Sequence, residues 1–259
     1  ALHLAVDKGT KKVLCGWFDE QETTRAYYIM LMNIIVNYGM PKKIKTDKRG
    51  TFSINNVKTK SKLNTTQFGR ICDDLEIQLH SSSDPLFKPN VERENKTFKG
   101  RLIAELRHEN ITDSISANEY LNNVFIPKIN ELFSYPVNPE KNDMRKNTYS
   151  FEELNVIISD QYSRKVDNAS SIKYDGKYYI PVDIETGEIL SYARNTECTV
   201  IIAYDYSLLC LIEDKICILS EVKAPEKKVY QKTTKSIEEI NRSKAHKPAP
   251  NHPWRNIKS

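Results

Sequence analysis

The residues best suited to chemistry begin just after Pro89, where one acidic and two basic side chains recur at helical spacing. Glu92 is followed by Lys96 and Lys99, four and seven residues on, so a helix would place all three along one stripe. Apolar residues of the same stretch repeat on another side of that helix: Val91, Phe98, Leu102 and Leu106. A carboxylate beside two ammonium groups suits a site that holds a metal ion and a phosphate. The alternative is an ordinary solvated face with an i,i+4 Glu–Lys pair.

Asp47 is the second candidate. It ends a short, buried-looking strand, Lys43–Thr46, and Gly50 follows where the loop must turn sharply. Ligands of α/β proteins usually bind at the carboxyl ends of strands, so an Asp in this place is a candidate ligand. The alternative is an Asp that caps a turn.

Together Asp47 and Glu92 predict a site for Mg²⁺ or Mn²⁺. Mg²⁺ favours a few carboxylates plus substrate phosphate oxygens over a complete protein cage. Two such ions about 3.5–4 Å apart would stabilise the attacking and leaving oxygens of a phosphoryl displacement. The chemistry expected is therefore metal-dependent phosphoryl transfer.

The elements that must position these residues form one series. Strands, helices and turn residues alternate in the order β-β-α-β-α-β-α, which predicts a mixed sheet flanked by helices. The predicted elements before the Glu92 helix are strands 2–7 and 13–18, a helix over 22–38, a strand at 43–46, a helix over 65–75 and a strand at 76–80. Residues 53–65, rich in Lys, Asn and Thr, read as a surface insertion.

The second half of the chain changes character. A helical pattern over 117–133 contains Pro127, which should kink or divide it. Residues 136–165 read as a linker with a short helix at 151–159, and five strand-like runs between 172 and 219 predict a small all-β barrel over 166–222. The clustered tyrosines of this barrel are more typical of core and β-forming positions than of a surface that stacks on bases. Residues 223–259 hold ten Lys and Arg against three Glu, a basic and disordered tail that could bind DNA through counterion release, although a solvated tail without function is the alternative.

Composition limits the cellular setting. The 259 residues are 39% hydrophobic and 28% charged, with a net charge of +5, a mild bias toward polyanions. The five cysteines show no metal-binding spacing, so we expect reduced, mostly buried thiols. No apolar run approaches the length of a membrane span and no signal peptide is recognisable, which disfavours membrane and secreted classes. We expect a cytosolic protein.

Dispersed motifs in this order resemble the catalytic core of ISNCY-type insertion-sequence transposases, relatives of retroviral-type integrases. The matching segments are 2–7, 16–18, 21–23, 38–41, 46–52, 66–68, 81–85, 91–93, 101–107, 117–121 and 252–255. The resemblance implies an RNase H-like core over 1–135 with three acidic residues, of which Asp47 would be the second and Glu92 the last. It implies DNA contacts for Arg93, Lys96 and Lys99, and a barrel similar to that of Mu-type transposases. It also implies transposon ends and target DNA as partners, a homo-oligomer on DNA, and strand cleavage followed by strand transfer.

The first acidic residue is the open question. Asp7 would complete a triad within the chain, but the resemblance places the first carboxylate on a strand followed by two more strands and a helix. Because only two strands precede the helix near Glu22, Asp7 matches the end of the second strand, and the first strand is expected upstream of Ala1. Asp7 then reads as a turn-initiating residue before Lys8 and Gly9.

Two departures from the family pattern bear on activity. Lys88-Pro89-Asn90 replaces a Lys-Gly loop, and Lys48-Arg49-Gly50-Thr51 is altered after Asp47. Three hypotheses therefore stand: an active DDE-type transposase, a catalytically dead DNA-binding remnant, and another RNase H-like nuclease. The third is disfavoured because a barrel and basic tail fit strand transfer better.

Overall fold

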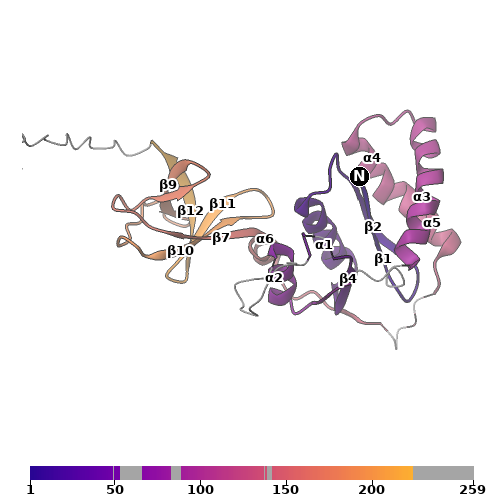
Figure 1. Ribbon diagram of the computed structural model, residues 1–259, viewed down its shortest axis with the longest axis horizontal. Helices are drawn as coiled ribbons and strands as arrows, with labels where there is room; N and C mark the ends of the chain where they lie inside the picture. Colours follow the sequence, from indigo (N-terminus) through magenta and orange to yellow (C-terminus); the bar gives the residue numbers. More distant parts are fainter. Residues whose placement is uncertain (49, 53–65, 83–88, 137, 139–141, 224–259) are drawn as a thin grey trace, which may run out of the picture. The chain divides into compact units, whose positions relative to one another are not determined.

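The computed structural model describes residues 1–48, 50–52, 66–82, 89–136, 138 and 142–223, and gives the backbone but not the side chains of 89–97 and 99 (Figure 1). The predicted surface insertion and the basic tail therefore lie outside the described residues.

The chain begins with an antiparallel hairpin of β1 (Leu2–Val6) and β2 (Val13–Phe18), as predicted. Ala5 pairs with Cys15 and Val6 with Val13, so Leu14 is an extra, bulged residue on β2. A bulge of this kind reverses the alternation of side chains. For this reason Val13, like Phe18, packs on the same side of the hairpin as Leu4.

Helix α1 (Thr24–Tyr38) packs beneath two separate sheets. Its N-terminus is capped by Thr23, whose side chain accepts a hydrogen bond from the Ala26 N–H, and it ends at Gly39, which has a φ of 98°. Met30 and Ile34 pack against the β1–β2 hairpin. The other side of the helix enters a larger cluster that the second sheet and the next helix complete.

That second sheet is a parallel pair, β4 (Lys43–Thr46) and β5 (Gln78–Ser81), connected through α2 (Gln67–Asp74). Buried Phe68 and Ile71 of α2 and partly buried Ile44 and Leu79 of the strands pack into the same cluster as α1. A further two-stranded pairing, β3 (Met40–Pro41) with β6 (Met144–Arg145), was not predicted. It ties the segment after residue 142 back to the end of α1.

A second helical layer covers the side of the hairpin away from α1 (Figure 1). It consists of α3 (Pro89–His108), α4 (Ser114–Tyr120), a π-helical turn η3 (Leu121–Phe125) and α5 (Ile126–Phe133). Phe98 and Phe125, both fully buried, meet edge to face with ring centroids 5.0 Å apart. The backbone stays helical from α4 through α5, so Pro127, in the first turn of α5, does not divide the helical segment as predicted; only the hydrogen-bond pattern changes, in the π turn before it. The π turn that precedes it was not predicted.

The remaining strands form a nearly closed, barrel-like antiparallel sheet in the order β7-β10-β11-β12-β9-β8, preceded by α6 (Phe151–Ile157). The strands are β7 (Asp160–Lys165), β8 (Ile172–Tyr174), β9 (Lys177–Asp183), β10 (Glu197–Ile202), β11 (Leu208–Ile212) and β12 (Lys215–Val222). A bridge between Val166 and Ile172 brings the two edge strands together. Tyr179 is buried in its core, and Tyr174 and Tyr192 pack against that core.

Strand β7 corrects the sequence analysis, which assigned residues 160–165 to the linker. Its sequence, DQYSRK, is polar throughout, so it lacks the apolar run that marked the other strands. It is a strand because it pairs with β10 over its whole length, from Asp160 opposite Ile202 to Lys165 opposite Glu197.

The cysteines agree with a further expectation, since all five are free and buried. Within the described residues, no helix combines the length and the apolar character needed to cross a membrane.

Candidate functional site

Asp47 directly follows β4, where the strand is held firmly against β5. The Thr46 hydroxyl lies 3.0 Å from the Ser81 hydroxyl, and the Ser82 N–H donates to the Thr46 carbonyl at 3.1 Å. Asp47 itself is half-buried. Asp47 therefore lies at the carboxyl end of a strand, as predicted. Ligands of α/β proteins usually bind at this end of a sheet.

The alternation of side chains along β4 indicates on which face of the β4–β5 sheet Asp47 lies. Ile44 packs toward α1 and α2, whereas Lys43 and Lys45 are exposed on the opposite side. Asp47 continues the Lys43–Lys45 series. Because α1 packs beneath both sheets and α3 covers the opposite side of the hairpin, Asp47 and α3 belong to the same side of the fold.

Helix α3 carries the other predicted residues. Its backbone is helical from Pro89, so Glu92, Lys96 and Lys99 lie within roughly 60° of one another around its axis, and Phe98 lies roughly 120° from Glu92. The side chains of Glu92, Arg93, Lys96 and Lys99 lie outside the described residues.

The buried side of α3 agrees with the predicted apolar stripe. Phe98 and Leu102 are 0% and 1% exposed, and Leu106 packs against the same cluster, whereas the Val91 side chain is outside the described part. Burial of this stripe fixes the rotation of α3 about its axis.

Asp7 is committed to the hairpin turn. Its Oδ2 accepts hydrogen bonds from both the N–H and the hydroxyl of Thr10, each at 2.7 Å. Its backbone N–H and C=O bond to Lys12 and Lys11 at 2.8 and 3.0 Å. These contacts suit the turn-initiating role and leave one carboxylate oxygen, Oδ1, outside this pattern.

Three asparagines close the outer edge of β2, a feature that sequence reasoning missed. Each side-chain amide accepts from the N–H and donates to the C=O of one β2 residue: Asn118 with Phe18, Asn122 with Gly16 and Asn130 with Val13. The distances lie between 2.6 and 3.0 Å. This asparagine ladder satisfies the backbone groups that an edge strand would otherwise expose.

The π turn keeps this ladder in phase. Asn118 and Asn130 lie twelve residues apart, which in an ideal α-helix would rotate the second by about 120° relative to the first. One π turn takes up about one extra residue and reduces this offset to about 20°. Close approach also requires Gly16, where an added Cβ would lie 2.8 Å from Leu121 Cδ2.

The outer edges of β1 and β4 are not closed by an asparagine ladder of this kind within the described residues. Among the described strands, β1 pairs with β2 alone and β4 with β5 alone, yet both sheets rest on α1. Since the asparagine ladder occupies the outer edge of β2, this sheet can be extended only along β1.

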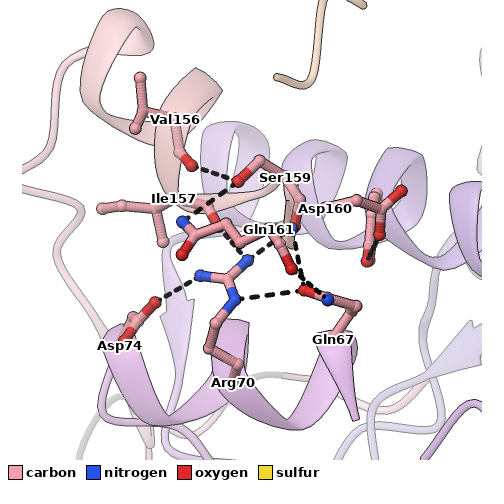
Figure 2. A network of polar contacts seen from close by, with 9 residues as sticks. Gln67, Arg70, Asp74, Val156, Ile157, Ser159, Asp160 and Gln161 are labelled. Atoms are coloured by element: carbon pink, nitrogen blue, oxygen red, sulfur yellow. Dashed lines mark hydrogen bonds and ion pairs between the residues drawn. The ribbon is translucent and has the colours of Figure 1, made fainter. Parts of the chain in front are cut away.

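A polar network joins α2 to the segment that leads into the barrel (Figure 2). The Arg70 guanidinium donates to the carbonyls of Ile157 and Ser159 at 3.2 and 2.6 Å and forms an ion pair with Asp74 at 2.6 Å. The Gln67 amide donates to the Gln161 carbonyl at 2.7 Å and accepts from the Gln161 N–H at 3.1 Å.

Tyr28 of α1 extends the same contact by donating to Asp160 at 2.7 Å. Burial and this hydrogen bond raise the pKa of Tyr28, so the phenol remains a donor. The start of β7 is thus fixed to the helices that pack beneath β4 and β5.

The arrangement can offer carboxylates to a metal, but it does not present a complete site. The described part of the chain contains no group of three or more His, Cys, Asp or Glu side chains suited to a metal ion. Asp47, a hard oxygen ligand at a strand end, fits Mg²⁺ or Mn²⁺. Glu92 is the predicted second carboxylate, and its side chain lies outside that part.

Comparison with known proteins gives the context for this geometry. No family model matches the chain. The chain is 34% identical over 257 residues, 98% of its length, to the transposase for insertion sequence IS1202 of Streptococcus pneumoniae, of which it spans 54%. It is 29% identical over 143 residues, 55% of its length, to a putative transposase, y4bF, of Sinorhizobium fredii, of which it spans 31%. The chain thus spans about half or less of these relatives, and nearly all of it is similar to part of an insertion-sequence transposase.

Proposed function

We propose that this chain contains most of the catalytic core and the following barrel of a DDE-type DNA transposase with an RNase H-like arrangement. The observation that carries the proposal is the position of Asp47, at the carboxyl end of β4 and on the same side of the fold as the helix that bears Glu92. Similarity to two transposases supports the same conclusion. The substrate is then DNA, and the reaction is strand cleavage followed by transfer of the 3′ end to target DNA.

The edges of β1 and β4 that pair with no other described strand support the proposed arrangement. A strand inserted between them would join the hairpin and the parallel pair into one mixed sheet over α1. We place the first carboxylate of the triad on such a strand and not at Asp7, because the Asp7 carboxylate serves its own turn. This strand would end beside Asp47.

In this mechanism Asp47 and Glu92 hold the metal, which when bound would activate the attacking oxygen and stabilise the leaving oxygen. Lys96 and Lys99, on the stripe of α3 headed by Glu92, bind the phosphates on either side of the cleaved bond, and Arg93 adds a further contact. The fixed helices and strands position the DNA so that the attacking oxygen is in line with the leaving oxygen. No covalent bond to the protein is required. End pairing implies a homo-oligomer on DNA.

A DNA-binding protein without catalytic activity is the alternative. The hydrogen bonds that hold Asp7 in its turn favour this alternative for residues 1–259 taken alone, because these residues would then lack one of the three catalytic carboxylates.

Strand transfer in Mn²⁺ tests the proposal, measured with this chain and with the full-length protein on a labelled transposon end. We expect activity of the full-length protein alone, abolished by Asp47→Asn and by Glu92→Gln and retained by Asp73→Asn on α2. Activity that survives Asp47→Asn would refute the site. Activity of residues 1–259 that is lost in Asp7→Asn would show that Asp7 is the first carboxylate.

A further inference from the structure

The second half of α3 continues the stripe that Glu92 begins. Helical geometry places Ile103 roughly 20° and Arg107 roughly 60° from Glu92 around the helix axis. The Ile103 side chain is 48% exposed, and Arg107 is exposed as well. The stripe therefore runs about 22 Å along the helix, from Glu92 to Arg107.

A glycine in the same part of α3 is not explained by protein packing. Gly100 is exposed and lies roughly 20° from Arg107 around the axis. A Cβ added at Gly100 would meet no described atom within 4 Å beyond the neighbouring backbone of the helix itself, whereas one added at Gly16 would meet Leu121. Glycine inside a helix is less favourable than alanine, and one reason to keep it is the close approach of a ligand to the backbone.

The charges on this side of α3 indicate what kind of ligand would approach. After Glu92 the stripe carries the basic residues Lys96, Lys99 and Arg107. Glu105 lies roughly 140° from Glu92, on another side of the helix, where its carboxylate pairs with Lys128 at 2.8 Å. A row of basic residues beside a helix backbone without a side chain is complementary to the sugar–phosphate backbone of a nucleic acid.

We propose that the DNA processed at Asp47 continues along the second half of α3, where its backbone lies against Gly100 and Arg107 binds a phosphate. This inference rests on the proposed function and extends the DNA contact on α3 by about two helical turns. The Arg107 guanidinium suits a phosphate because it can donate two parallel hydrogen bonds. Ile103, between them on the same stripe, contacts the sugar. A side chain at position 100 would hold the DNA away from both residues.

Equilibrium binding without metal tests this proposal separately from catalysis. The affinity of the full-length protein for a fluorescent transposon-end duplex is measured by anisotropy in EDTA, between about 50 and 200 mM KCl. The test variants are Gly100→Ala, Gly100→Leu and Arg107→Gln. The matched control is Arg101→Gln, because Arg101 is also an exposed arginine of α3 but lies roughly 120° from Arg107, over the Phe133 ring at 5.2 Å.

We expect Arg107→Gln to reduce the salt slope by about 0.9 and to bind roughly 3- to 8-fold more weakly at about 0.1 M salt, the effect of one lost phosphate contact. Gly100→Leu should bind roughly 5- to 150-fold more weakly, as an overpacked contact does, and Gly100→Ala should lose less. Because both residues are better helix formers than glycine, the midpoint of thermal unfolding of the free protein should not fall. Arg101→Gln should keep the parent's affinity and slope.

Two results would overturn the contact along α3. One is parent affinity in Gly100→Leu, or a fall in its thermal midpoint that would give Gly100 a structural reason. The other is an equal loss in Arg101→Gln and Arg107→Gln. Both would leave the site at Asp47 intact, since strand transfer tests that site. Failure of the parent to bind any DNA would overturn the proposed function itself.

Discussion

The asparagine ladder makes a quantitative prediction at Asn130. Its amide accepts from the Val13 N–H and donates to the Val13 C=O, both at 2.8 Å, and Val13 is 1% exposed. Asn130→Ala removes both partners, and burial prevents water from replacing them. Each of the two unsatisfied backbone groups costs about 1–3 kcal/mol, so we expect a loss of about 2–6 kcal/mol in the free energy of unfolding. For a domain of this size, with about 2–4 °C per kcal/mol, the midpoint of thermal unfolding should fall by at least about 4 °C.

Urea denaturation followed by circular dichroism measures this loss. The matched control is Asn37→Ala, because the Asn37 amide is exposed and donates only to the Asn33 carbonyl within α1. This control should change stability by less than about 0.5 kcal/mol. If Asn130→Ala is as stable as the control, the ladder does not hold the edge of β2, and our reason for placing the additional strand beside β1 is lost.

Three further predictions concern the barrel junction, acid stability and thiol reactivity. Arg70→Lys keeps the charge but loses the forked contact with the Ile157 and Ser159 carbonyls, so denaturant unfolding should show a loss of about 1–3 kcal/mol; an unchanged midpoint would contradict this. The Lys215 ammonium and backbone N–H groups lower the pKa of Asp183 to about 2, so its contribution to stability is present above pH 4 and is lost as pH falls toward 2. Asp183→Asn should therefore flatten the acid limb of the stability curve, and an unaltered limb would refute the assignment. Burial raises the pKa of Cys72 to about 12, so a disulfide reagent at pH 8 should modify it only after unfolding, and rapid modification of the folded protein would contradict its burial.

Local sequence patterns were sufficient to predict most of the elements. The hairpin strands and β11 are apolar runs bounded by turn residues, and β4 and β8 are short β-forming segments next to such residues, so their ends could be placed within a residue or two. Asp47 could be identified for the same reason, since a strand that ends in Asp before a glycine-containing loop is a local signal.

Contacts between distant residues could not be predicted in this way. Asn122 bonds to Gly16, a separation of 106 residues, and nothing in the sequence around either residue indicates the pairing. Strand β7 is polar and exists because β10 provides hydrogen-bonding partners. The position of the first carboxylate could not be predicted locally either, because it depends on how two separate sheets are joined.

The measurement that tests the central claim most directly is Fe²⁺-mediated cleavage of the polypeptide. Fe²⁺ substituted for Mg²⁺ reduces added H₂O₂ to hydroxyl radical and hydroxide, with ascorbate to reduce Fe³⁺ back to Fe²⁺, and the radicals cut the backbone next to the metal, where mass spectrometry locates the cuts. If Asp47 and Glu92 share one metal site, cuts should cluster near residues 47 and 92, and excess Mg²⁺ or Asp47→Asn should suppress both. Cuts at only one of these positions, or cuts near 92 that persist in Asp47→Asn, would show that the two carboxylates do not form a common site.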